Sequence, residues 1–228
     1  MKNNKMKYLN LTIVTGIAAS ALCLLSALPA QAQVAWTGGA SPDMNWSTGG
    51  NWSGSVPPGA ADSVVFGDTG TDATQGNVNN VVDAAFASPI ASLTYDHTNN
   101  FHTTQIAAGQ TLTDTGDLTV SGPATDGQII TYASITGGGG ALAMTGSSAI
   151  LSAHNDKSGS GHDSTHGTLD MSGLGMFTAN IGQMLSGASG NYRSSGTIYL
   201  AETNDITLTA STLAIDIGDA GGNNGGDG

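Results

Sequence analysis

The stretch WTGGASPDMNWSTGGNWSGSVPPGAADSVVF, residues 36–66, holds all three tryptophans of the chain and introduces a long series of short apolar segments. Gly, Asn, Asp or Pro separates these segments, and many of them alternate apolar with polar residues, as in Ser92-Leu-Thr-Tyr95. Such alternation is the period of a half-buried strand. Beyond residue 32 the chain has one Glu and one Lys, so residues typical of exposed helices are almost absent. The sequence therefore predicts an all-β protein.

The spacing of the segments predicts a parallel β-helix, a solenoid. Strand-like segments of three to six residues recur at roughly 8 to 12 residues, so two or three of them make a coil of about 20 to 25 residues. Gly is abundant and aromatic residues make up 5% of the chain, too few to fill a compact globule. An antiparallel sandwich or jelly roll predicts similar spacing. Against this alternative, few Asn-Gly or Asp-Gly hairpin turns lie between matched segments.

The N-terminus has the features of a cleaved signal peptide. Lys2, Lys5 and Lys7 precede an apolar segment over residues 9–28, and Ala30-Gln-Ala32 supplies an Ala-x-Ala cleavage site. The mature chain then begins at Gln33 and lacks cysteine. The expected organisation is a signal peptide at 1–32, a Trp/Asn-rich cap at 33–66, β-helix coils at 67–217 and a Gly/Asn/Asp-rich tail at 218–228.

Charge restricts the partners of the mature chain. The mature chain contains two basic residues, Lys157 and Arg193, and all 17 acidic residues, which gives a net charge of 2 − 17 = −15. Nucleic acid and anionic membrane surfaces are poor partners for such a surface, and we expect neither nucleic-acid binding nor membrane insertion after cleavage. Sixteen of the acids are Asp, which suits turns. We expect no cofactor; the alternative is Ca²⁺ bound by Asp and backbone carbonyls between coils.

Candidate site residues are few, and we expect no catalytic residues and a non-enzymatic protein. Trp46 and Trp52 are either a cover for the first coil or an exposed platform for stacking a sugar. His154, His162 and His166 are candidate metal ligands, but Gly, Ser and Asp surround them, so the alternative is a flexible loop. The competing function is an extracellular carbohydrate-active β-helix enzyme or a carbohydrate-binding module.

Several motifs resemble bacterial secreted proteins that carry autotransporter-associated β-strand repeats. The residues that carry this resemblance are Trp36, Asn45-Trp46, Asn51-Trp52, Pro57, Asp62-x-Val64-x-Phe66, Ile90-x-Ser92-Leu93-x-Tyr95, Ile135 to Gly146, Gly167 to Leu174, Ser195 to Ala201 and Asn204 to Thr207. The resemblance implies a right-handed parallel β-helix, passenger-like and structural or adhesive, secreted or on the surface of a Gram-negative-type bacterium. Its implied partners are a surface polysaccharide or another cell-surface protein. The chain departs from the family in having neither a C-terminal β-barrel pattern nor a PEP-type sorting tail, which is consistent with a fragment of a longer product.

The last segments predict an inward-facing apolar row. Alternation places the side chains of Tyr199, Thr207, Ala214 and Asp216 outward. The residues predicted to be buried inside are Ile198, Leu200, Ile206, Leu208, Leu213, Ile215 and Ile217.

Overall fold

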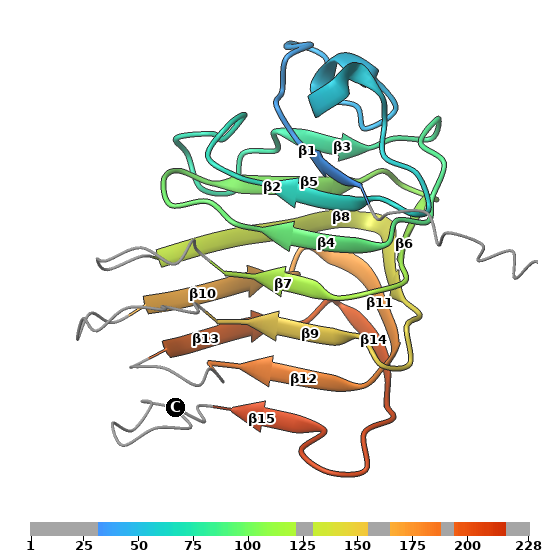
Figure 1. Cartoon of the computed structure of the whole chain (residues 1–228), viewed down its shortest axis with the longest axis vertical. Coiled ribbons are helices and arrows are strands. Elements are labelled where there is room, and N and C mark those ends of the chain that lie inside the picture. Colours follow the sequence, from blue (N-terminus) through green and yellow to red (C-terminus); the bar gives the residue numbers. More distant parts are fainter. Residues whose placement is uncertain (1–31, 122–129, 155–164, 188–193, 218–228) are drawn as a thin grey trace, which may run out of the picture.

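The computed structural model describes residues 32–121, 130–154, 165–187 and 194–217. These residues form an all-β structure with parallel sheets, in which the strands stack in layers from the N-terminal to the C-terminal end (Figure 1). The only helices among them are two short 3₁₀ turns, η1 (Gly49–Asn51) and η2 (Ser53–Ser55), at the N-terminal end. None of these helices is long and apolar enough to cross a membrane. The predicted signal peptide, except Ala32, and the predicted tail lie outside the described residues.

The first sheet has seven strands and forms one side of the stack. In spatial order they are β1 (Gln33–Ala35), β2 (Ser63–Phe66), β4 (Ser92–Tyr95), β7 (Leu118–Val120), β9 (Ile150–Ala153), β12 (Gln183–Ser186) and β15 (Ile215–Ile217). Spatial order equals chain order, so the sheet grows in one direction along the sequence. Every neighbouring pair is parallel.

The second sheet has eight strands and covers the other side of the core. They are β3 (Asn80–Val82), β5 (His102–Ile106), β6 (Thr111–Asp114), β8 (Ile130–Met144), β10 (Thr165–Asp170), β11 (Leu174–Ile181), β13 (Ser194–Tyr199) and β14 (Thr203–Leu208). The long strand β8 links two ladders: its first part pairs with β5 and β10, and its last part pairs with β6 and β11. Although Gly separates many of the strand-like segments, Gly137 to Gly140 lie inside β8, whose backbone reaches a φ of 126° at Gly137.

The pairing pattern agrees with the predicted parallel strands and corrects the predicted spacing. All named strand pairs among the described residues are parallel, whereas an antiparallel sandwich or jelly roll requires antiparallel pairs. In the first sheet the steps from Val64 to Leu93, from Leu93 to Leu118 and from Leu118 to Leu151 are 29, 25 and 33 positions. The predicted repeat of 20 to 25 residues is therefore too short for most steps, because the connections between strands take up more of the chain than we assumed.

The core lies between the sheets and follows the alternation along each strand. In β2 and β4 the side chains of Val64, Phe66, Leu93 and Tyr95 are buried, while their neighbours in sequence are only half-buried. In-register residues of parallel strands face the same side, so each inward side chain packs on the one in the next strand. The result is one continuous apolar core.

Several aspartates hold turns in place. Asp68 accepts hydrogen bonds from the backbone N–H of Thr98 at 2.6 Å and of Asn99 at 3.1 Å, and it thereby ties two successive connections together. Asp83 accepts from the N–H of Ser47 at 3.0 Å. Short acidic side chains suit this task because they reach nearby backbone amides.

Candidate functional site

The three tryptophans form a buried cluster at the N-terminal end. The rings of Trp36 and Trp46 each contact Trp52 edge-on, with centroid distances of 4.9 Å and 5.2 Å. The indole Nε1 of Trp46 donates to Asn80 Oδ1 at 2.9 Å, and that of Trp52 donates to the Trp46 carbonyl at 2.7 Å. Trp46 is 0% exposed and Trp52 is 2% exposed. Neither ring presents a face to a sugar, and the cluster instead covers the end of the core.

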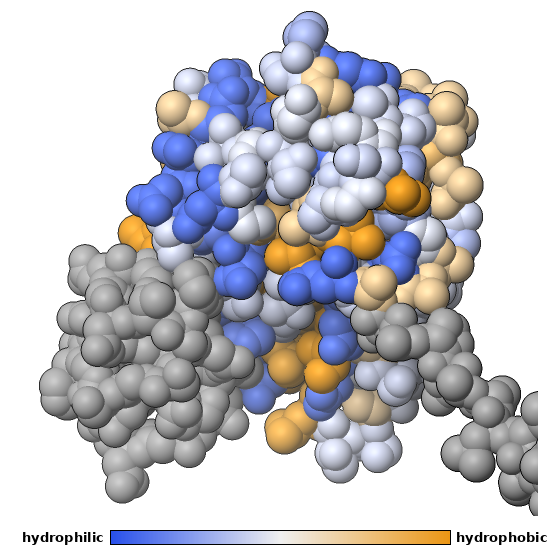
Figure 2. Space-filling model, turned by 45° about the horizontal axis from the view of Figure 1, so that its top comes forward, coloured by the Kyte–Doolittle hydropathy of each residue, from blue (hydrophilic) through white to orange (hydrophobic). Residues whose placement is uncertain are grey.

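The outside of this end is mostly polar. In Figure 2 hydrophilic and neutral residues dominate the N-terminal end, and apolar residues form small, separated patches. The apolar aromatic rings thus lie beneath a polar surface. The apolar core is therefore covered at the N-terminal end of the stack.

Two of the three candidate histidines, His154 and His166, lie in the described residues, on neighbouring backbone segments: a Cβ added at Gly167 would be 2.8 Å from the backbone nitrogen of His154. His166 lies in β10, where its Nδ1 is 2.7 Å from Ser195 Oγ and its Nε2 is 3.3 Å from Thr197 Oγ1. His154 directly follows β9, and His162 lies outside the described residues. Within the described ranges no group of three or more His, Cys, Asp or Glu side chains is arranged to hold a metal ion.

Other titratable groups are buried in the core rather than gathered in a cleft. His102 Nε2 is 2.8 Å from the Gly67 carbonyl, and its Nδ1 is 3.3 Å from the amide nitrogen of Asn79. A carbonyl only accepts, so Nε2 carries the proton, and burial lowers the pKa of His102 to about 4. On Asp114, burial raises the pKa to about 7. Its Oδ1 accepts from the Gly116 N–H at 3.0 Å, whereas its Oδ2 has no partner among the described residues.

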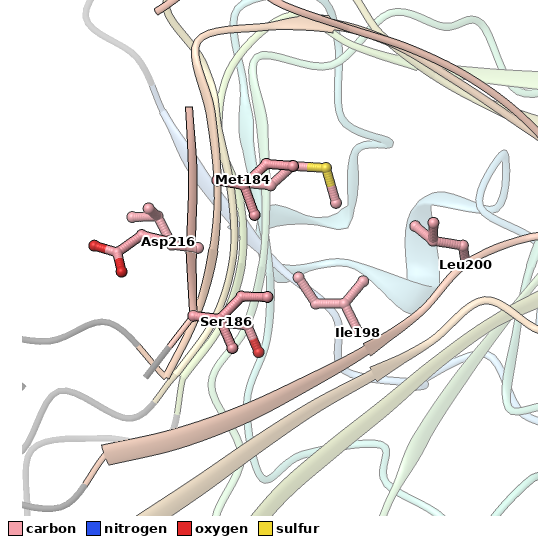
Figure 3. A pocket seen from close by; sticks show the side chains of 8 residues that line it. Met184, Ser186, Ile198, Leu200 and Asp216 are labelled. Atoms are coloured by element: carbon pink, nitrogen blue, oxygen red, sulfur yellow. The ribbon is translucent and has the colours of Figure 1, made fainter. Parts of the chain in front are cut away.

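The C-terminal end of the stack differs from the N-terminal end because its core is open. A cavity of about 170 Å³ is lined by side chains of β12, β13 and β15 and by Leu200. In Figure 3 Met184, Ile198 and Leu200 point into this cavity, whereas Asp216 points away from it. Since Asp216 faces outward, alternation turns its neighbours Ile215 and Ile217 toward the cavity.

The exposure of this end corrects our expectation of a buried row. Ile215 is 61% exposed and Ile217 is 70% exposed, and Leu200 and Leu213 are exposed as well. Ile198, Ile206 and Leu208 are half-buried against the core. The inward direction of Ile215 and Ile217 agrees with the prediction, but the predicted burial is wrong, because no described strand lies beyond β15. We call this surface the open end.

The open end also has unpaired strand edges and acidic side chains around it. Among the described residues β13, β14 and β15 each have a hydrogen-bonded strand on one side only. Glu202, Asp205 and Asp216 lie in or beside these strands. No Lys or Arg occurs in the described ranges. The open end therefore combines an apolar centre, strand edges that pair with no further described strand, and acidic side chains.

A second surface, on the outer side of the eight-stranded sheet, has a polar character. Thr103 in β5, Ser134 in β8, Asp170 in β10 and Tyr199 in β13 occupy one register position in four neighbouring strands. The residue before each of the first three, as in Leu169 before Asp170, is buried in the core, so this set points to the outer side of the sheet, where Thr103 and Ser134 are nevertheless covered. We call these four residues the polar row. Thr103, Ser134 and Asp170 line a cavity of about 190 Å³.

Sequence reasoning missed the polar row. Successive members of the row are 29 to 36 positions apart in the sequence, and no local motif joins them. The available signal was the outward position of each residue next to an apolar one, but only the strand register brings them side by side. No protein-family model, no curated protein and no solved structure matches this chain.

Proposed function

We propose that this protein is a non-enzymatic, passenger-like module that is secreted or displayed on the surface of a Gram-negative-type bacterium and has a structural or adhesive role. In this proposal residues 67–217 form the coils of a right-handed parallel β-helix, and residues 33–66 form its cap. Three features support it: parallel pairing of successive segments, the buried tryptophan cluster at one end, and the resemblance to proteins with autotransporter-associated β-strand repeats.

The observation that carries the proposal is the difference between the two ends. Tryptophans close the N-terminal end, whereas at the open end no described strand covers the apolar centre and the strand edges. Exposed strand edges accept further strands, and exposed apolar patches mark association surfaces. The proposed role is therefore to join other β-structure of the cell surface at the open end while the capped end stays unpaired.

Sedimentation of the purified protein tests this role. Two open ends repel each other through their carboxylates, so we expect a concentration-dependent dimer that is favoured at about 1 M NaCl, where the Debye length falls to about 3 Å. The double variant Ile215→Lys/Ile217→Lys should be monomeric. Val56→Lys is the matched control, because Val56 is 64% exposed at the capped end. A monomer at all salt and protein concentrations, or a dimer that survives the double variant, would contradict the role of the open end.

We further propose that the module has no resident cofactor. Asp68 and Asp83 are occupied by hydrogen bonds from backbone amides, which supports a turn role for the acids. EDTA should then leave the Tm unchanged. A lower Tm in EDTA that Ca²⁺ restores would instead establish Ca²⁺ binding.

A further inference from the structure

We propose that the polar row is a binding site for a neutral polysaccharide. The proposal adds a ligand to the adhesive role, and to that extent it rests on the proposed function. Binding itself requires neither export nor association at the open end. It can therefore be tested separately on the purified protein.

One hydroxyl of the polar row has no hydrogen-bond partner among the described residues. Thr103 is 2% exposed, and its hydroxyl has no hydrogen-bond partner among the described residues although it lines the polar cavity. An unpaired buried hydroxyl costs free energy unless a ligand or water satisfies it. Ser134, its in-register neighbour, adds a second hydroxyl to the same cavity, and this hydroxyl also interacts with the Tyr132 side chain. Hydroxyls both donate and accept, which matches the hydroxyls of a sugar.

Asp170 is held as a fixed acceptor at the centre of the row. Its Oδ1 accepts from the Ser172 N–H at 2.9 Å and from Ser172 Oγ at 2.6 Å, and its Oδ2 accepts from the Tyr132 hydroxyl at 2.5 Å. Burial raises the pKa of Asp170, but these hydrogen bonds outweigh it, and the pKa lies below its usual value. A carboxylate has about four acceptor positions, so one remains for a ligand hydroxyl.

Tyr199 provides an apolar platform beside the carboxylate. It is in register with Asp170 in the neighbouring strand, faces the same outer side, and is 52% exposed. A Tyr side chain offers a large contact area and a hydroxyl while losing little conformational entropy on binding. A ring next to fixed polar groups suits a sugar, which has an apolar face and a polar rim.

Charge and geometry select a neutral polymer among ligands rich in hydroxyls. With no Lys or Arg in the described ranges and a mature net charge of −15, an anionic polysaccharide would be repelled. A bare Ca²⁺ ion would need six to eight oxygen ligands, and this site offers a single carboxylate that already accepts three hydrogen bonds. The row crosses four strands, about 14 Å at about 4.8 Å per strand, and so favours a chain over a single sugar.

The experiment is affinity electrophoresis followed by calorimetry with a neutral glucan, mannan and galactan, and with polygalacturonate as the anionic probe. We expect retardation by at least one neutral polymer and none by polygalacturonate. Tyr199→Ala should weaken binding at least about tenfold, as expected for an aromatic contact of large area. Thr103→Val and Asp170→Asn should each weaken it about fivefold or more. Thr111→Val is the matched control, since it removes an exposed hydroxyl from β6 outside the polar row and should leave the Kd unchanged.

Several results would overturn the proposal. The first two are that no neutral polymer retards the protein, or that polygalacturonate retards it more strongly. The other two are that EDTA abolishes binding, or that the Tyr199→Ala variant binds the polymer as tightly as wild type. Because Tyr199 is exposed, its variant should fold even if Thr103→Val does not, and a thermal melt checks this. The double variant Ile215→Lys/Ile217→Lys should bind the polymer normally. Failure of end-on association and failure of glycan binding are thus separate outcomes.

Discussion

His102 is a neutral histidine enclosed by the core, and its surroundings make stability depend on pH. The carbonyl of Gly67 and the amide of Asn79 satisfy both ring nitrogens in the neutral form. His97 packs edge-on at 5.1 Å, and burial also lowers its pKa. Asp68 partly offsets the shift on His102. Two adjacent buried imidazoles thus favour neutrality, and acid should weaken the fold at this point.

The pH dependence of His102 can be isolated by substitution. The pKa is about 4 in the folded state and about 6.5 when unfolded, so the unfolded state binds a proton first as the pH falls. Between pH 6.5 and pH 4 the wild-type protein should lose about 3 kcal/mol of stability through this group. His102→Gln should lack this contribution. Urea unfolding of both proteins at several pH values measures the difference, and parallel profiles would contradict the assignment.

The effect of Asp114 on the pH dependence of stability should be opposite to that of His102. Its pKa is raised from about 4 when unfolded to about 7 when folded, so the folded state holds a proton that the unfolded state has released. The associated stability is present below about pH 4 and is lost as the pH rises to about 7, by at most about 4 kcal/mol. Asp114→Asn should therefore be more stable than wild type at pH 8 and lack this slope. A variant that is less stable at pH 8 would show that the carboxylate is stabilised by a contact.

Strand β8 needs glycine where it passes Ile106, most strictly at Gly137. Gly137 has a φ of 126°, and a Cβ added there would lie 2.1 Å from the carbonyl oxygen of Ile106. Only glycine adopts this conformation readily, and no side chain fits so close to backbone. The bend allows β8 to take part in both ladders of its sheet.

A pair of adjacent substitutions tests this role. Gly137→Ala should lower the free energy of unfolding by about 3 kcal/mol through strain and overlap. Gly138→Ala is the control, because a Cβ at Gly138 meets no atom within 4 Å and its effect should stay within about 0.5 kcal/mol. Equilibrium urea denaturation compares the two. Equal losses at both positions would mean that backbone entropy, and not the bend, accounts for the effect.

The site of signal-peptide cleavage determines whether the mature protein keeps its first strand, β1. Gln33 is both the first residue after the predicted cleavage site and the first residue of β1, which pairs with β2. Cleavage after Ala32 would leave this edge strand intact. We predict that intact-mass analysis of protein exported by a Gram-negative host gives a chain that starts at Gln33. Ala32→Leu should block processing, and exported wild-type protein that retains residues 1–32 would contradict the prediction.

Local patterns along the chain were sufficient to predict its class and many of its strands. Alternation located β2 at Val64 to Phe66 and β4 within residues 90–95, because burial on one face demands a period of two wherever a strand lies. The same patterns indicated that the tryptophans belong together near the start, but left open whether they are covered or exposed. Burial of Trp46 answers this, since Asn80 and Phe86, far along the chain, pack against it.

Pairing between strands and the state of the two ends follow from contacts that no local pattern contains. Parallel partners lie 25 or more positions apart in the first sheet, and a shift of one residue would exchange the two faces. The polar row arises from this register, as Thr103, Ser134 and Asp170 meet only when three strands align. Ile215 has the sequence pattern of a core residue, yet it is exposed because burial requires a further layer above it, and no described strand supplies one.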